Sequence, residues 1–357
     1  MSIQRISHFY SWKVDLILDV RSPSEYQHAH IPGALNLPLF TDEERSVVGT
    51  LYKQASRQEA IKTGLTYFGP RMKEMILTVE AWLRQRYALE TDIELIPSDY
   101  TLLVHCWRGG MRSGGVAWLL DLYGFKVQVL EGGYKAFRNW VLGIFQKPHE
   151  LNIIAGNTGA AKTRVLHKLS DMGKCVIDLE ALAAHKGSAF GNIGMPEQPG
   201  QEMFENLLAF ELTKWDGNAI IWLEDESIRI GQVNLPKEFW LLMQTSTHYV
   251  LQVPFEKRLD YTVEEYGKLP LEKMINAIVR IKKRLGGLEA GNAINALIED
   301  RVRDAFSVLL RYYDKWYQKA LDQKNLPADQ LKVIPCFDTD PQTNAALVIA
   351  LTENIPQ

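Results

Sequence analysis

Cys106 is the side chain of this sequence whose neighbours best suit it to nucleophilic chemistry. It ends the apolar run of VHCWRGGMRSGG, residues 104–115, and Arg108 and Arg112 follow with two glycines between them. A strand that leads into glycines and then a helix start forms a loop whose backbone N–H groups point inward. Such a field lowers the pKa of a thiol and favours the reactive thiolate. The alternative is a buried structural cysteine, a common role for free cysteine.

The spacing of this loop indicates which groups it can hold. Five residues separate Cys106 from Arg112, and a Cys-x5-Arg loop is sized for a tetrahedral phosphate. The length of the loop therefore favours a phosphate-bearing substrate and allows phosphoryl transfer. The predicted catalytic residues are Cys106, Arg108 and Arg112, and the predicted substrate loop adds Trp107, Gly109, Gly110 and Met111.

The segment upstream of the loop resembles the signature of the rhodanese family. The matching motif is DVRSPSEYQHAHIPGALNLP, residues 19–38. In that family the loop cysteine carries a sulfane sulfur as a persulfide, so the resemblance implies chalcogen transfer as the other possibility beside phosphoryl transfer. The resemblance implies that Asp19 and Arg21 belong to the structural framework near the loop. It also implies a characteristic turn formed by His30, Pro32 and Gly33. The sequence departs from the family in one respect, because sulfur-carrying rhodanese loops are usually one residue shorter than this one.

A second glycine-rich loop, GNTGAAKT, follows a predicted strand and opens a predicted helix. A phosphate-binding P-loop requires that context, with Lys162 as the point charge and Thr163 available to Mg²⁺. Ala161 replaces the last glycine of the pattern, and if that position needs a positive φ, alanine costs about 1 kcal/mol there. This argues against NTP hydrolysis more than against phosphate binding, and a plain strand–turn–helix is the alternative. The predicted diphosphate loop comprises Gly156, Asn157, Thr158, Gly159, Ala160, Ala161, Lys162 and Thr163.

Three acidic residues end a further apolar run, AIIWLEDES. Glu224, Asp225 and Glu226 occupy the place of an acid near a metal in nucleotide-binding folds, although acids also end strands for solubility alone. No cluster of His and Cys residues has the spacing of metal ligands. The sequence therefore predicts no cofactor with certainty and leaves Mg²⁺ as an option.

Both loops need strands that end at them and helices that start after them. Strand patterns occupy residues 14–20, 99–106, 124–133, 151–156, 174–179, 219–225, 248–255 and 331–337. Helical patterns occupy residues 70–90, 134–145, 162–173, 271–287 and 297–321. We predict two α/β domains joined near QKPHE: an N-terminal rhodanese-like domain at residues 1–146, and a C-terminal P-loop-type domain with a parallel sheet and additional helices at residues 147–357.

The composition is that of a globular protein, with 46% hydrophobic and 23% charged residues. Three cysteines, odd in number and far apart, argue against disulfides and for a reducing cytoplasm. The N-terminal residues hold no apolar stretch long enough for a signal peptide or a membrane span, so we expect a cytoplasmic protein with no membrane partner. The net charge of −3 gives no general attraction to nucleic acid, and RNA binding would need a local basic face.

Several separated motifs, taken in order, resemble the bacterial tRNA 2-selenouridine synthase family over nearly the full length. They include DEERSVVGTLYKQ, HCWRGGMRSGG, VLEGGYKAFR, GNTGAAKT, DLEALAAHKGSAFG, LEDES and YGKLPLEKMINAIVRIKKRLGG. The resemblance implies a transferase that replaces the sulfur of wobble 2-thiouridine in tRNA with selenium from selenophosphate, through an S-geranylated intermediate made from geranyl diphosphate. Cys106 maps onto the family's selenium-carrying cysteine. The P-loop would then hold geranyl diphosphate, and a nucleotide is the alternative ligand.

Basic residues of the helix at residues 271–287 are candidates for contact with tRNA. Lys273, Arg280 and Arg284 line one side with Lys283 beside them, away from an apolar stripe that begins at Leu271. A solvated charged surface is the alternative. The aromatic residues of RYYDKWYQK are expected to pack rather than to stack on bases. The loop at His185–Gly191 matches the family, but its residues indicate no role.

Two other classes of function fit parts of the sequence. A phosphatase or arsenate-reductase-like domain fused to a nucleotide-binding module fits the length of the cysteine loop, although that loop contains no evident general acid. A P-loop kinase with an inactive rhodanese domain fits the second half, but Cys106 and its two arginines argue against it. The oligomeric state and the choice of tRNA stay open.

Overall fold

The computed structural model describes residues 3–7, 12–90, 93–215, 217 and 219–353. The chain divides into two compact units: unit 1 comprises Met1–Ile144 with Glu205–Phe210, and unit 2 comprises Phe145–Phe204 with Glu211–Gln357. The segment Glu205–Phe210 lies inside helix α8 (Gln201–Leu212) and groups with unit 1, whereas a division after residue 146 assigns it to the second domain. This grouping depends on long-range contacts, which no local sequence pattern records.

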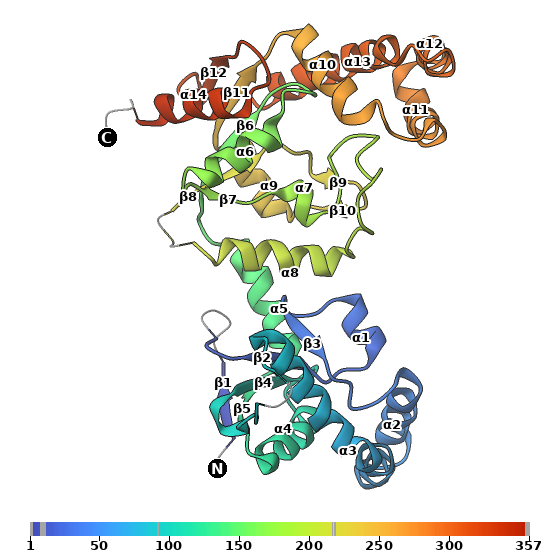
Figure 1. Ribbon diagram of the computed structural model, residues 1–357, viewed down its shortest axis with the longest axis vertical. Helices are drawn as coiled ribbons and strands as arrows, with labels where there is room; N and C mark the ends of the chain where they lie inside the picture. Colours follow the sequence, from blue (N-terminus) through green and yellow to red (C-terminus); the bar gives the residue numbers. More distant parts are fainter. Residues whose placement is uncertain (1–2, 8–11, 91–92, 216, 218, 354–357) are drawn as a thin grey trace. The chain divides into compact units, whose positions relative to one another are not determined.

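Unit 1 is built on a five-stranded sheet whose strands are connected by helices along the chain (Figure 1). Its strands lie in the order β1 (Gln4–Ile6), β5 (Lys126–Leu130), β4 (Thr101–His105), β2 (Leu16–Asp19) and β3 (Ala34–Asn36), and each neighbouring pair is parallel. The helices are α1 (Pro23–His28), α2 (Asp42–Gln54), α3 (Arg57–Tyr87), α4 (Met111–Tyr123) and α5 (Gly133–Ile144), with a short 3-10 turn, η1 (Pro97–Asp99). The core joins the central strands to α3 and α4 through Leu18, Val104, Val79, Val116 and Leu120.

Helices α2 and α3 form the part of unit 1 that the sequence pattern described least well. The helix expected at residues 70–90 begins at Arg57, where the Ser56 hydroxyl accepts the N–H of Glu59 at 3.1 Å. Pro70 therefore lies inside α3 rather than at its start. Glu44 of α2 accepts a hydrogen bond of 2.8 Å from Arg71 of α3, which ties the two helices together.

Unit 2 contains a second five-stranded sheet, ordered β12 (Leu331–Pro335), β11 (Thr247–Gln252), β6 (Glu150–Ala155), β8 (Ile220–Glu224) and β7 (Cys175–Val176), with parallel neighbours throughout. An antiparallel pair, β9 (Arg229–Ile230) and β10 (Val233–Asn234), is separate from it. The helices attached to this sheet are α6 (Lys162–Asp171), α7 (Leu179–Leu182), α9 (Lys237–Gln244) and α14 (Pro341–Glu353). Two α/β units with parallel sheets confirm the predicted fold class.

Four further helices of unit 2 share a separate core: α10 (Phe255–Tyr266), α11 (Leu271–Leu285), α12 (Gly287–Ile298) and α13 (Val302–Gln323). The single helix expected at residues 297–321 is wrong, because α12 ends at Ile298 and α13 starts at Val302. Asp300 between them has φ +57°, a left-handed conformation that interrupts the helix. Leu271 is 43% exposed and so does not join the apolar stripe predicted for α11.

Candidate active site

The cysteine loop joins the carboxyl end of β4 to the start of α4. β4 ends at His105, and α4 begins at Met111 with Gly110 as its N-cap. This arrangement directs the N–H groups of the loop and the positive end of the helix dipole toward the same space. The strand, loop and helix that the sequence predicts around Cys106 are all present.

A second pair of glycines supports the loop from the start of α5. Tyr134 donates its N–H to the carbonyl oxygen of Cys106, and Lys135 donates to that of Trp107, both at 2.9 Å. Gly133 has φ +58°, and a Cβ built there would lie 2.3 Å from the Cys106 carbonyl oxygen, so only glycine fits. The sequence pattern indicated no role for this segment beyond its match to the family motif VLEGGYKAFR. The two adjacent glycines after a predicted strand could have indicated a tight contact.

The Cys106 thiol is buried and held by polar neighbours. The residue is 3% exposed, and its Sγ lies 3.3 Å from Oγ of Ser113. That hydroxyl also donates to the Gly110 carbonyl oxygen at 3.1 Å, so it can turn between the carbonyl and a thiolate. Burial acts to raise the pKa of the Cys106 thiol, but the Ser113 hydroxyl and the Arg112 charge outweigh it and lower the pKa. These neighbours therefore make the thiolate more accessible than in a free cysteine, and Ser113 is a contributor that the sequence pattern did not indicate.

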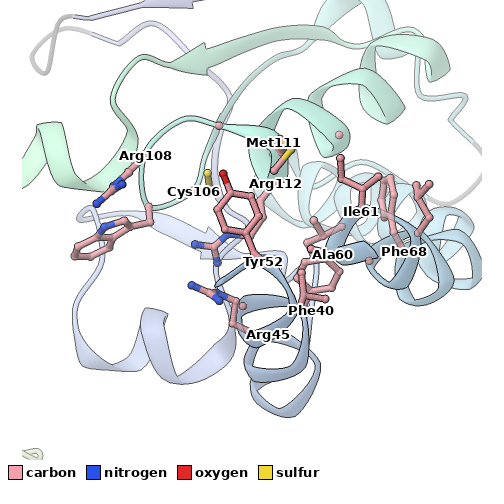
Figure 2. A pocket seen from close by; sticks show the side chains of 18 of the residues that line it. Phe40, Arg45, Tyr52, Ala60, Ile61, Phe68, Cys106, Arg108, Met111 and Arg112 are labelled. Carbon is pink, nitrogen blue, oxygen red and sulfur yellow. The ribbon is translucent and has the colours of Figure 1, made fainter. Parts of the chain in front are cut away.

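The two arginines of the loop have different surroundings. Arg112 donates to the carboxylate of Glu25 in α1 at 2.6 and 3.3 Å, and Arg45 of α2 lies 3.6 Å from the same group. Burial acts to raise the pKa of Glu25, but Arg112 brings it below its usual value. Arg108 is exposed, and in Figure 2 its side chain points away from Phe68. A phosphate at this loop would compete with Glu25 for Arg112, a partner that spacing alone did not reveal.

The other predicted loop residues contribute backbone and exposed apolar surface. Gly109 has φ +65°, and a Cβ there would lie 2.5 Å from the Leu130 carbonyl oxygen. Trp107 and Met111 are 38% and 51% exposed. The loop thus offers a substrate its N–H groups together with two apolar side chains at its rim.

The framework expected from the rhodanese resemblance lies next to this loop. Arg21 is buried, donates to one carboxylate oxygen of Asp19 at 2.9 and 2.5 Å, and places its guanidinium 3.9 Å from the ring centroid of Tyr134. Tyr134 is the residue whose N–H donates to the cysteine loop. The turn expected at Pro32 and Gly33 is present, with Gly33 at φ +81°.

The glycine-rich loop of unit 2 joins β6 to α6, as the sequence predicts: residues 156–161 form the loop, and Lys162 and Thr163 are the first two residues of α6. Lys162 donates from Nζ to the Gly156 carbonyl oxygen at 2.9 Å, so its stem crosses the loop. Thr163 donates from Oγ1 to Glu180 at 3.0 Å. The Lys162 cation therefore lies at the start of the loop, beside the backbone of Gly156.

Ala161 has φ +57° and ψ +32°, the left-handed conformation in which a side chain is strained. We expect Ala161→Gly to raise the free energy of unfolding by about 1 kcal/mol, because glycine adopts this conformation without that strain. Ala160→Gly is the matched control, since Ala160 is fully buried and its methyl group would be lost without any relief. Urea titration measures both variants, and equal destabilisation by the two would contradict the prediction.

Helix α13 contacts the phosphate loop directly. The Tyr317 hydroxyl accepts the N–H of Gly156 at 2.7 Å, and Asp314 accepts from the Asn157 side chain at 2.8 Å. Arg258 donates to Asp314 at 2.8 Å and fixes it in place. The aromatic segment of α13 was expected to pack, and one of its tyrosines also supports the phosphate loop. Residues 161 positions apart make this contact, so no local pattern could reveal it.

The acidic residues at the end of β8 have different partners. Glu224 accepts the N–H of Glu180 at 2.7 Å, whereas Asp225 pairs with Lys324 at 2.5 Å. Burial foremost, together with the Glu180 charge, raises the pKa of Glu226 to about 8. Glu180, from α7, thus joins this acidic group, and the Lys162 charge acts to lower the pKa of both Glu180 and Glu226. Within the described ranges no three His, Cys, Asp or Glu side chains are arranged to hold a metal ion.

The basic residues predicted to contact tRNA, Lys273, Arg280, Lys283 and Arg284, are exposed on α11. Arg280 also donates to the Ala189 carbonyl oxygen at 3.1 Å and so helps hold the loop at 185–191. In that loop a Cβ built on Gly187 would lie 2.7 Å from the carboxylate of Glu226. The loop whose role the sequence left open therefore connects the basic helix to the acidic group beside Lys162.

No helix among the residues that the structure describes is long and apolar enough to cross a membrane.

Comparisons with known proteins cover both units. Residues 149–330 match the family model of the tRNA 2-selenouridine synthase AAA domain, and residues 7–139 match that of the rhodanese-like domain. A relative from Shewanella sediminis named tRNA 2-selenouridine synthase is 36% identical over 342 residues, which cover 86% of this chain and 88% of the relative. A relative of the same name from Hydrogenovibrio crunogenus is 34% identical over 346 residues, 88% of this chain and 91% of the relative. This chain therefore belongs to the tRNA 2-selenouridine synthase family.

Proposed function

We propose that this protein replaces the sulfur of wobble 2-thiouridine in tRNA with selenium from selenophosphate, through an S-geranylated intermediate made from geranyl diphosphate. The observation that carries the proposal is the presence, in one chain, of an activated Cys-x5-Arg loop and a P-loop. The names of the relatives support tRNA as the substrate and selenouridine as the product. The two loops support the two phosphate-bearing reactants.

The P-loop of unit 2 suits the geranyl transfer. The diphosphate of geranyl diphosphate would lie on the loop N–H groups and Lys162, with Thr163 and Glu180 as oxygen ligands for Mg²⁺. The sulfur of 2-thiouridine forms a C–S bond with the first carbon of the geranyl group, and the C–O bond breaks as diphosphate leaves with its electron pair. Lys162 stabilises the charge that develops on this leaving group. No NTP is hydrolysed in this step.

The cysteine loop of unit 1 suits the release of selenium. Attack of the Cys106 thiolate at phosphorus forms an S–P bond and breaks the P–Se bond, and selenide leaves with the electron pair. Attack at selenium would instead expel phosphorus in a reduced state, so capture of the phosphoryl group is the balanced course. The selenium of selenophosphate carries a proton when the P–Se bond breaks, so the leaving group is HSe⁻, a weak base that needs no general acid from the protein, which agrees with the lack of one in the loop sequence. Water then hydrolyses the phosphocysteine, and selenide displaces geranylthiolate from C2 of the base.

Mass spectrometry of the protein after quenching with selenophosphate tests this course. We expect a phosphoryl adduct on Cys106, held at the N–H groups of the loop and beside Arg112. A selenium adduct without a phosphoryl adduct would show that the thiolate attacks selenium and carries it.

The exposed cations of α11 are proposed to bind tRNA phosphates. We expect Arg284→Glu to weaken tRNA binding about tenfold and to lower the salt dependence, because the reversal removes one phosphate contact and adds repulsion. Arg284 suits this test better than Arg280, which also holds Ala189. Lys237→Glu, a reversal of an exposed charge on α9, is the control. Filter binding at two salt concentrations measures the tRNA affinity of both variants. If Arg284→Glu binds tRNA as tightly as Lys237→Glu does, α11 is only a solvated surface.

A further inference from the structure

A pocket of about 1020 Å³ lies beside Cys106 within unit 1 (Figure 2). Its walls come from α2, α3 and the start of α4, together with the cysteine loop. Most of the side chains that form its walls are apolar, among them Phe40, Val48, Ile61, Leu65, Phe68 and Trp118. Small-molecule sites measure roughly 300–1,000 Å³, so this pocket has room for a ten-carbon chain and part of a base.

The apolar wall is open to solvent. Leu65, Met111 and Trp118 all line the pocket and are 56%, 51% and 50% exposed. Contiguous exposed apolar surface of this kind marks a place where a ligand or partner binds. Gly64 also lines the pocket and has no side chain to fill it; a Cβ built there would lie 3.2 Å from Cζ of Phe40. The pocket is therefore shaped for an apolar group rather than filled by its own side chains.

Cations surround the part of the pocket that contains Cys106. Arg45, Lys53, Arg108 and Arg112 all line it, and Lys53 and Arg108 are exposed. Figure 2 shows Arg45 and Arg112 on the same side as the Cys106 sulfur, with Ile61 and Phe68 farther along the pocket. An apolar cavity edged by cations is complementary to a hydrocarbon chain attached to a polyanion.

We propose that this pocket binds the geranyl chain of S-geranylated 2-thiouridine in tRNA and thereby presents C2 of the base at the Cys106 loop. This inference rests on the proposed function and adds to it a binding site for the intermediate, separate from the P-loop. One sulfur bonds both the geranyl chain and C2, so a chain held in the pocket keeps C2 at its mouth. Selenide released at Cys106 forms the C–Se bond there, the C–S bond breaks, and geranylthiolate leaves with the electron pair.

Leu65→Glu tests the site against a matched control on the same helix. Leu65 and Leu77 both lie on α3 and are 56% and 52% exposed, but Leu65 lines the pocket and Leu77 does not. Full-length protein would be titrated with two anticodon stem-loop RNAs, one carrying S-geranyl-2-thiouridine and one carrying 2-thiouridine. We expect wild type and Leu77→Glu to bind the geranylated RNA at least about tenfold more tightly, as burial of several methylene groups implies. Leu65→Glu should lose this preference and keep its affinity for the 2-thiouridine RNA.

Ile61→Glu is a second variant of the pocket wall, and circular dichroism checks the folding of each protein. A preference for geranylated RNA that survives in both folded variants would overturn the inference. Loss of affinity for geranyl diphosphate alone would also overturn it, because the donor would then be the occupant. Conversion of the geranylated RNA by wild type and selenophosphate tests the proposed function separately. If no conversion occurs while the Leu65-dependent preference persists, the proposed function fails and the pocket assignment stands.

Discussion

Replacing Cys106 with alanine is expected to stop the formation of 2-selenouridine and to leave S-geranylated 2-thiouridine as the end product. The Cys106 thiolate is the group that would cleave selenophosphate, whereas geranyl transfer at the P-loop uses none of its atoms. Loss of a nucleophile of this kind lowers a rate by at least about 1,000-fold. The measurement is mass spectrometry of nucleosides after incubation with tRNA, geranyl diphosphate and selenophosphate.

Two further experiments make this prediction specific. Cys175→Ala removes a half-buried thiol of β7 in unit 2 and should leave both products unchanged. Added selenide should restore 2-selenouridine formation by Cys106→Ala, because the thiolate is needed only to release selenide. Normal use of selenophosphate by Cys106→Ala would refute the assignment of this loop.

The sequence predicted the parts of both sites that lie close together along the chain. The glycines and Cys106 lie in loops between one strand and one helix, and Lys162 is the first residue of the helix that follows, so their order is a local pattern. Partners from elsewhere could not be predicted in this way. Glu25 pairs with Arg112 from 87 positions away, and Tyr317 reaches Gly156 from 161 positions away. Such contacts depend on how the strands are ordered in the sheet, which spacing does not record.

The pocket beside Cys106 was missed for a related reason. Its wall includes Ile61, Leu65 and Phe68, which lie in the first half of α3. The helical pattern predicted from the sequence covers residues 70–90 and so begins only at Pro70. The structure continues the helix through Pro70 from its Ser56 cap, and these apolar residues then share one wall. A helix boundary misplaced by thirteen positions was therefore enough to leave these wall residues outside the predicted helix.

Replacing Lys162 with methionine is expected to abolish geranyl transfer and to leave 2-thiouridine unmodified. Methionine keeps an unbranched apolar stem but removes the cation whose Nζ lies at the Gly156 carbonyl oxygen. The leaving diphosphate would then lack its nearest positive charge, and loss of one such stabilising group lowers a rate by about 100-fold or more. Glu180 would also lose the cation that favours its ionised form, so the site would hold less positive charge for an anion.

A matched control variant, and a tRNA substrate that is already geranylated, decide whether the P-loop acts in geranyl transfer. Lys168→Met changes a lysine of the same helix that pairs with Asp171 at 2.8 Å, and it should geranylate tRNA as wild type does. Lys162→Met should still convert synthetic S-geranylated tRNA to 2-selenouridine with selenophosphate, because the Cys106 loop is intact. Together with the Cys106 variant, this pair separates the two chemistries by unit. If Lys162→Met geranylates tRNA at the wild-type rate, the P-loop is a structural turn and the diphosphate must bind elsewhere.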